Sequence, residues 1–247
     1  MPRKLIRVSG SDRIEFLQNL VTNDVAGLSQ GLVYTALLTP QGKLLTDFFL
    51  VPDGDAILID VAEDEAAALA QRLSMYKLRS AVALDWDDRK VAQGLGTAPR
   101  DAFQDPRDPS LGWRAYGAEE KVIADWDDLR VKACVPEFGA ELSGETYILE
   151  AGFERLHGVD FKKGCYVGQE VTARMKHKTT LQKGLVLVEV DGPADPGSEI
   201  TSDGKPVGVL HTRSGNRAIA YLRFNRIKGD VFAGDAKITR LDETPSV

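Results

Sequence analysis

The chain has 247 residues, of which 43% are hydrophobic and 28% charged, the composition of a folded globular protein with a substantial core. Its formal net charge of −6 argues against general nucleic-acid binding, which requires clustered lysine and arginine. The sequence shows neither a secretory signal nor an apolar run of about 18 residues, so we expect a cytoplasmic protein with no membrane segment.

Helices and strands alternate in the first half of the sequence, as the change between apolar periods of 3.6 and 2 indicates. Two β-rich runs with Pro40 and Gly42 between them predict a hairpin, because both residue types favour tight turns. The expected elements are a strand at 5–8, a helix at 12–21, strands at 32–38, 43–51 and 56–61, a helix at 63–76, and strands at 82–84 and 91–95.

The second half begins with a predicted loop at 101–112, which is rich in proline and acidic residues. Helices are expected at 125–135 and 148–157. From residue 184, short apolar runs alternate with Gly, Pro and Asp, a pattern typical of a small antiparallel barrel. We therefore predict two domains, residues 1–180 and 181–247, with barrel strands at 185–190, 199–201, 207–211, 218–222 and 236–241.

The most informative segment is 163–170, Lys-Gly-Cys-Tyr-Val-Gly-Gln-Glu, which precedes and opens a short predicted helix. Between residues 162 and 178, five lysines or arginines stand against the single carboxylate of Glu170, a reversal of the overall charge. Neighbouring cations and helix N-termini lower the pKa of a thiol from about 8.5 and so favour the reactive thiolate. Cys165 is therefore the candidate reactive residue and Lys163 the cation that tunes it. A buried inert cysteine and a solvated lysine are the alternatives.

Other residue types narrow the chemistry further. Two cysteines and three histidines, none in Cys-x-x-Cys or His-x-x-x-His spacing, predict no self-contained metal site. Cys134, between Ala133 and Val135, is expected to be a small buried apolar residue. Gln169 is expected either to hydrogen-bond the cysteine loop or to cap the helix. Neither a Ser/His/Asp series nor a phosphate-binding loop is evident, which disfavours hydrolase and nucleotide-driven functions.

Four segments resemble the YgfZ/GcvT folate-binding family, in its branch tied to iron–sulfur cluster maturation. They are residues 161–170 (FKKGCYVGQE), which match the branch signature, and 16–25 (FLQNLVTNDV), 38–43 (LTPQGK) and 76–79 (YKLR). The resemblance covers most of the chain and implies an α+β fold: two mixed α/β lobes of the aminomethyltransferase-like folate-binding type with a C-terminal antiparallel β-barrel. It also implies tetrahydrofolate as cofactor, a role in assembly or repair of 4Fe–4S proteins, and iron–sulfur client or assembly proteins as partners.

One departure separates this chain from the relative with defined chemistry, the glycine-cleavage aminomethyltransferase. That enzyme carries an Asp-Asp pair in the segment that residues 42–49 resemble, and here the pair is Thr46-Asp47. A threonine hydroxyl does not supply the charge of a carboxylate. The resemblance therefore favours a folate-binding accessory factor acting through Cys165. The alternatives are a tetrahydrofolate-dependent aminomethyltransferase or other one-carbon transferase, and an interaction module whose folate pocket has decayed.

Four residues are candidates for folate contact. Asn23, Tyr34 and Asp47 lie in segments that resemble the folate-facing first domain, and their side chains suit the polar edge and flat face of a pterin. Arg174 is the candidate partner of the glutamate tail, because guanidinium pairs bidentately with carboxylate. The alternatives are a helix stop at Asn23, an outward-facing strand position for Asp47, and an intrahelical pair of Arg174 with Glu170.

Overall fold

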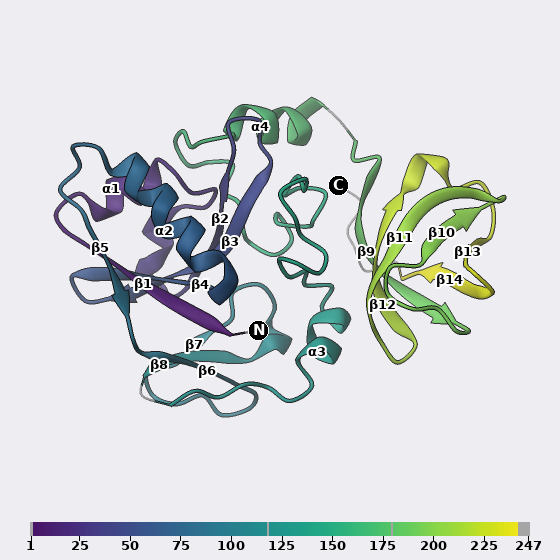
Figure 1. Ribbon diagram of the computed structural model, residues 1–247, viewed down its shortest axis with the longest axis horizontal. Helices are drawn as coiled ribbons and strands as arrows, with labels where there is room; N and C mark the ends of the chain where they lie inside the picture. Colours follow the sequence, from purple (N-terminus) through teal and green to yellow (C-terminus); the bar gives the residue numbers. More distant parts are fainter. Residues whose placement is uncertain (1, 118, 179, 242–247) are drawn as a thin grey trace. The chain divides into compact units, whose positions relative to one another are not determined.

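The computed structural model describes residues 2–117, 119–178 and 180–241 (Figure 1). The chain forms two compact units, which we call the first unit (Met1–Ile123 with Phe153–Val171) and the second unit (Ala124–Gly152 with Thr172–Val247). The chain therefore passes between units at three places, whereas the sequence predicted a single division after residue 180. Among the described residues, no helix is both long and apolar enough to cross a membrane.

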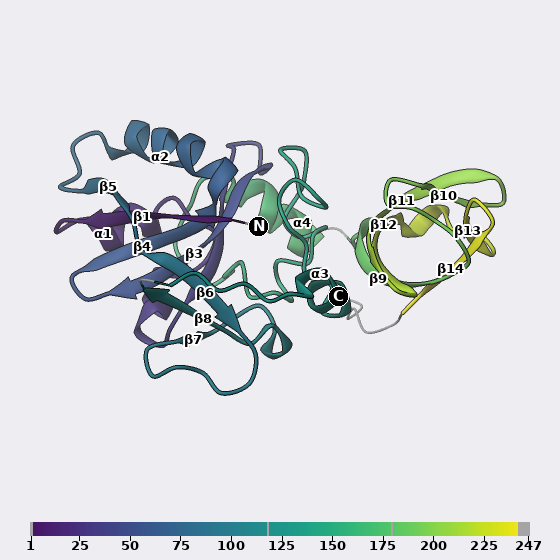
Figure 2. The ribbon, with the colours of Figure 1, turned by 60° about the horizontal axis from the view of Figure 1, so that its bottom comes forward.

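The described part of the first unit is built on an antiparallel sheet of five strands in the order β2-β3-β4-β1-β5. One face of the sheet packs against α1 (Arg13–Gln18), η1 (Val25–Ser29) and α2 (Glu63–Lys77), as Figure 2 shows for α2. Apolar side chains at every second strand position build this core, for example Phe48 and Leu50. The strands are β1 (Arg3–Ser9), β2 (Val33–Leu38), β3 (Leu44–Asp53), β4 (Ala56–Ala62) and β5 (Ala83–Asp87).

A smaller sheet, in the order β6-β8-β7, belongs to the same unit and contributes to a polar layer on the other face of the large sheet. Its strands are β6 (Lys90–Gly94), β7 (Phe103–Gln104) and β8 (Trp113–Gly117), and η2 (Pro109–Leu111) precedes β8. In the polar layer, the Asp60 carboxylate accepts hydrogen bonds from Arg3 and Arg114. The Asp105 carboxylate accepts from Arg107 and Arg114. The two carboxylates and the three arginines of this layer are therefore all paired, as buried charges require.

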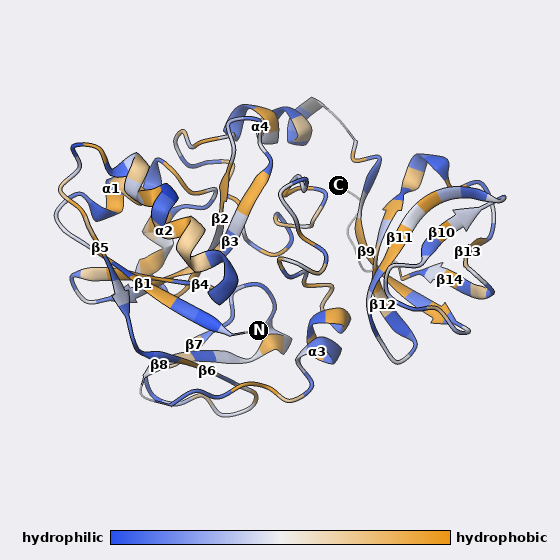
Figure 3. Ribbon diagram, viewed as in Figure 1, coloured by the Kyte–Doolittle hydropathy of each residue, from blue (hydrophilic) through white to orange (hydrophobic). Residues whose placement is uncertain are grey.

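The second unit contains a closed antiparallel barrel of six strands within the described residues, in the order β10-β11-β12-β9-β14-β13. Closure leaves no sheet edge unpaired, and buried apolar residues of the strands form the core of the barrel. Figure 3 shows where hydrophobic and hydrophilic positions fall along these strands. α3 (Trp126–Lys132) packs on the barrel through Arg130, which donates to Thr212. The barrel elements are β9 (Lys183–Asp191), β10 (Glu199–Ser202), β11 (Lys205–Ser214), β12 (Arg217–Arg223), η3 (Phe224–Arg226), β13 (Val231–Ala233) and β14 (Ala236–Arg240).

Most predicted elements are confirmed, including the hairpin of β2 and β3, the helix α2 and the C-terminal barrel. The helix predicted at 148–157 is wrong, because these residues form successive turns. Gly152 and His157 have positive φ values of 77° and 54°, which do not continue a right-handed helix. The loop predicted at 101–112 contains β7 and η2, and the sequence analysis missed β8 and β13.

Candidate functional site

Cys165 lies in an irregular loop that leads into α4 (Gln169–Lys178), and its side chain is exposed. The residues that flank the exposed stretch are buried: Lys163 and Tyr166 are each 7% exposed. Gly164, between Lys163 and Cys165, has open space where a Cβ would stand. The loop therefore presents a thiol at the surface between two buried anchors, and the alternative of a buried, inert Cys165 is wrong. Cys134 is 5% exposed, as predicted.

The ammonium of Lys163 is enclosed by main-chain carbonyl groups at and after the end of α1. Its Nζ donates to the carbonyl oxygens of Gln18 at 2.7 Å, Val21 at 2.5 Å and Asn23 at 3.1 Å. An ammonium has three donors, so these three acceptors account for all of them. The alternative of a solvated Lys163 is wrong, while its predicted tuning of Cys165 stays a prediction.

The electrostatic environment of Lys163 combines burial with attraction. Burial lowers the pKa of Lys163 from 10.5 to about 8, and the carboxylates of Asp24 and Asp160 act in the opposite direction. The ring of Tyr166 lies with its centroid 5.2 Å from Nζ, within the range of a cation–π contact. Lys163 and Tyr166, the buried residues on either side of Gly164 and Cys165, therefore contact one another.

Further hydrogen bonds join the segment after α1 to the turn that precedes the cysteine loop. Thr22, which is fully buried, donates through Oγ1 to the Gly158 carbonyl at 2.7 Å and accepts from the Asp160 amide at 3.1 Å through its own carbonyl. The Asn23 side-chain amide donates to the His157 carbonyl at 2.7 Å. The motif at residues 16–25 therefore binds the segment that leads into the cysteine loop. The sequence analysis did not predict that Thr22 makes these contacts.

The turn between β2 and β3 holds the other end of the cysteine loop. Gly168 has φ 83°, and a Cβ built on it would lie 2.6 Å from the Thr39 carbonyl oxygen. Gly42 has φ 77°, and its Cβ would lie 2.8 Å from the Cβ of Val171. Only glycine satisfies both the conformation and the close approach at these positions. The motif at residues 38–43 and the cysteine signature therefore contact one another through Gly42 and Gly168.

Gln169 adds a contact inside the loop. Its side-chain amide donates to the Gly164 carbonyl oxygen at a long distance of 3.5 Å, while its main-chain amide donates to the Tyr166 carbonyl at 3.2 Å. The predicted hydrogen bond from Gln169 to the loop that holds Cys165 is therefore confirmed.

The structure brings Asn23, Tyr34 and Asp47 into one connected group in the first unit. Asn23 donates through its amide to the Tyr34 carbonyl at 2.8 Å, and the Tyr34 hydroxyl donates to Oδ2 of Asp47 at 2.9 Å. The Tyr34 ring is fully buried and lies 5.3 Å and 5.2 Å, between centroids, from the rings of Phe49 and Phe153. Burial and the Asp47 carboxylate raise the pKa of the Tyr34 hydroxyl well above 10.

These contacts bear on the predicted folate roles. The Tyr34 ring is occupied by core packing and offers no open face to a pterin, and both amide hydrogens of Asn23 are used by main-chain carbonyls. Asp47 is half-buried, and Oδ2 of its carboxylate accepts the hydrogen bond from the Tyr34 hydroxyl. Arg174 is exposed on the part of α4 that belongs to the second unit. Folate contact by these residues stays a prediction.

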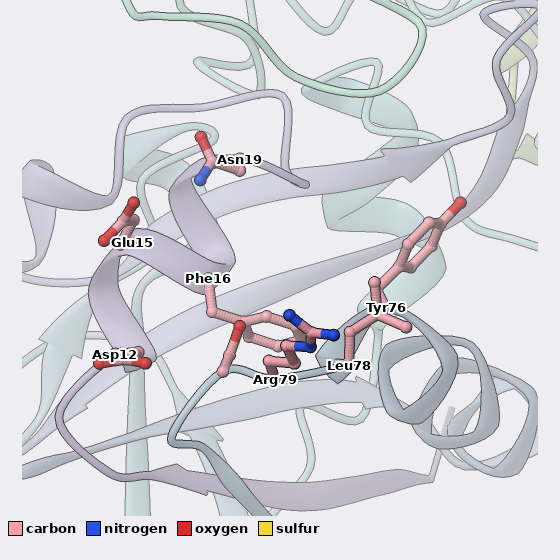
Figure 4. Close-up of a pocket in the computed structure, with 8 residues that line it drawn as sticks. Asp12, Glu15, Phe16, Asn19, Tyr76, Leu78 and Arg79 are labelled. Atoms are coloured by element: carbon pink, nitrogen blue, oxygen red, sulfur yellow. The ribbon is translucent and has the colours of Figure 1, made fainter.

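Cavities open on the described part of the first unit, and two of them are considered for ligand binding. One, of about 810 Å³, is lined by residues that include Asn23, Asp24, Gln104, His157 and Asp160. Its volume falls in the range typical of ligand sites, roughly 300–1,000 Å³. The other, of about 690 Å³, lies between α1 and the end of α2 (Figure 4) and is lined by Asp12, Glu15, Phe16, Asn19, Tyr76, Leu78, Arg79 and Ser80. Within the described ranges, no group of three His, Cys, Asp or Glu side chains is arranged to hold a metal ion.

The fold is that of aminomethyltransferase-like proteins with a C-terminal antiparallel barrel. The crystal structure of glycine cleavage system aminomethyltransferase T from Bartonella henselae superimposes with a TM-score of 0.77 over 99% of this chain and 84% of that one, at 17% sequence identity. Within this class, residues 182–243 match the family model described as CAF17, C-terminal beta-barrel domain.

Two curated relatives carry the name iron–sulfur cluster assembly factor IBA57 homolog, mitochondrial. The Phaeosphaeria nodorum protein is 30% identical over 91% of this chain and 69% of its own length. The Neurospora crassa protein is 33% identical over 82% of this chain, which spans about half (55%) of that relative. The chain therefore belongs to the IBA57/CAF17 family of iron–sulfur cluster assembly factors.

The relatives correct one prediction. Both are named as mitochondrial proteins, which contradicts the expected cytoplasmic localisation. The expectation rested on the absence of a secretory signal and of an apolar run long enough to cross a membrane. These features argue only against the secretory route and a membrane segment, and they do not distinguish the cytoplasm from a mitochondrial compartment.

Proposed function

We propose that this protein assists the assembly or repair of 4Fe–4S proteins, and that the thiol of Cys165 is the group through which it acts. The observation that carries the proposal is the exposed side chain of Cys165 on a loop whose two ends are anchored in the first unit. Family membership supports the iron–sulfur role, and the names of the relatives support assembly proteins or client proteins as partners.

The chemistry available to Cys165 is that of a thiolate ligand. The thiol loses its proton to solvent, and the thiolate donates an electron pair to an iron atom of a cluster in transit while another ligand of that iron leaves. No electron is transferred in this exchange. An exposed position suits it, because the cluster must arrive from one protein and depart to another.

A pair of cysteine variants tests the proposal. Cys165→Ser should abolish restoration of a 4Fe–4S enzyme in cells that lack the native gene, because a hydroxyl is a poor ligand for iron at neutral pH. Cys134→Ala is the matched control, since the Cys134 side chain is buried and outside the proposed chemistry. Enzyme activity and circular dichroism of both variants are the measurements. Full activity of the Cys165 variant would refute the role of the thiol.

We also propose tetrahydrofolate as a ligand of the first unit. The cavity lined by Gln104 and His157 has a volume typical of small-molecule sites. The fold is that of an aminomethyltransferase, and the family resemblance of the sequence implies that such a fold binds folate. The fit is partial, because the Tyr34 ring is enclosed in the core and both amide hydrogens of Asn23 are bonded to main-chain carbonyl groups. Calorimetry with tetrahydrofolate tests the proposal, and an absence of heat would favour an interaction module instead.

An accessory role is favoured over one-carbon transfer by the position of Thr46. Its side chain is 3% exposed and lies on the same face of β3 as Phe48 and Leu50, which belong to the apolar core. A hydroxyl in that place neither carries charge nor meets a substrate amine. Asp47 lies on the opposite face of the strand, where Tyr34 occupies one of its oxygens.

A further inference from the structure

We propose that Lys163 is a positioning residue for Cys165: main-chain carbonyl groups at the end of α1 hold its ammonium and thereby fix the loop that carries the thiol. The inference rests on the proposed function of Cys165. In it, Lys163 holds the loop in position and does not itself contact iron. Three observations on the described residues carry it.

The first observation is the completeness of the enclosure. Three carbonyl oxygens, of Gln18, Val21 and Asn23, lie within 3.1 Å of Nζ. Gln18 is the last residue of α1, where carbonyl groups lack partners within the helix. The lysine supplies these partners from 140 to 145 positions further along the chain. A lysine side chain that is 7% exposed loses most of its rotational freedom on burial.

The second observation is that the ammonium has no direct carboxylate partner in this arrangement. The carboxylates of Asp24 and Asp160 act on it only through the electrostatic field, and the Tyr166 ring lies beside it. Burying an ammonium costs free energy, and an apolar side chain of the same length would instead leave three carbonyl groups without this donor. These two effects oppose one another, and what the arrangement determines directly is geometry: it fixes the main chain two residues from an exposed thiol.

The third observation is the freedom of the chain between the lysine and the cysteine. Gly164 alone separates them, and it has no neighbour within 4 Å of where a Cβ would stand. Glycine has the largest backbone freedom of any residue. Without the ammonium in its enclosure, this end of the loop loses three hydrogen bonds and keeps the long one from Gln169 to the Gly164 carbonyl, whereas Gly168 still packs the other end against the turn after β2. Loss of the anchor should therefore act locally on Cys165.

Spin-label mobility measures this restraint directly. Cys165 is exposed and Cys134 is buried, so a thiol-directed nitroxide attaches selectively to Cys165 in the full-length protein. Lys163→Met keeps the length of the side chain and removes the charge, and we expect a several-fold faster motion of the label. Lys162→Met is the matched control, because Lys162 is exposed, and its label should move as in the wild type. Lys163→Arg, which keeps the charge and donors, should restore part of the restraint.

The outcomes separate positioning from general stabilisation. A lowered melting temperature with unchanged label motion in Lys163→Met would assign Lys163 to folding alone and overturn the proposal. If that variant does not fold, the wild-type protein decides: the Nζ protons of Lys163 should be protected and visible by ¹⁵N NMR, and rapid exchange with water would refute the enclosure. Retained activity of Cys165→Ser would refute the function but leave the mobility result standing.

Discussion

At the scale of single residues, the lysine of the cysteine signature shows how far local composition can mislead. A run of lysines beside a cysteine suggests a solvated basic surface, and Lys162 is indeed exposed. The next residue, Lys163, is buried and binds carbonyl groups of residues 18–23. Neither the charge pattern nor the helical period distinguishes Lys162 from Lys163, because the partners of Lys163 lie 140 to 145 positions away in the sequence.

The buried ammonium of Lys163 predicts a pH dependence of stability. Its pKa is about 8 in the folded protein and has the ordinary value of 10.5 in the unfolded chain. Between these values the unfolded chain binds more protons, so the free energy of unfolding rises with pH. Relative to Lys163→Met, the wild type should gain at most about 3 kcal/mol across this range and nothing below it. Urea unfolding of both proteins on either side of the lower pKa checks the sign, and a constant difference would contradict it.

At the scale of elements, the sequence predicted what periodicity and turn chemistry determine. The hairpin with Pro40 and Gly42 in its turn, the helix α2 and the barrel strands follow from such local signals. The helix predicted at 148–157 failed because Gly152 and His157 adopt positive φ, which the spacing of apolar residues does not indicate. The contact between the turn at 38–43 and Gly168 was equally hidden, although both motifs were recognised separately.

The packing of the two glycine motifs predicts unequal effects of two similar substitutions. Gly168→Ala places a methyl group 2.6 Å from the Thr39 carbonyl oxygen at φ 83°, so it should destabilise the protein by about 1–3 kcal/mol and displace the cysteine loop. Gly164→Ala meets open space and should change stability by less than about 0.5 kcal/mol. Denaturant unfolding of the two variants compares them. Equal costs would show that the turn after β2 yields to the extra methyl group.

At the scale of the whole molecule, the order of the chain differs from a simple pair of consecutive domains. Residues 124–152 belong to the second unit although the first unit resumes at Phe153. Buried polar contacts join this segment to strand β11 of the barrel: Arg130 donates to the Thr212 hydroxyl at 2.5 Å, and that hydroxyl donates to Glu141 at 2.5 Å. The change to short apolar runs at residue 184 indicates where the barrel begins. It does not indicate that residues 124–152 also pack in the second unit.

This dependence predicts the behaviour of a fragment that ends at residue 181. Without β11 the fragment lacks Thr212, so Arg130 and Glu141, both at least nine-tenths buried in the full chain, lose part of their network. We expect amides of α3 to exchange with solvent at least tenfold faster than in the full chain, because a helix of seven residues has little stability of its own. Amides of β4 should keep their protection, since their core lies within the first unit. Hydrogen exchange read by mass spectrometry compares the two segments in one experiment, and equal protection of α3 in fragment and full chain would place residues 124–152 with the first unit instead.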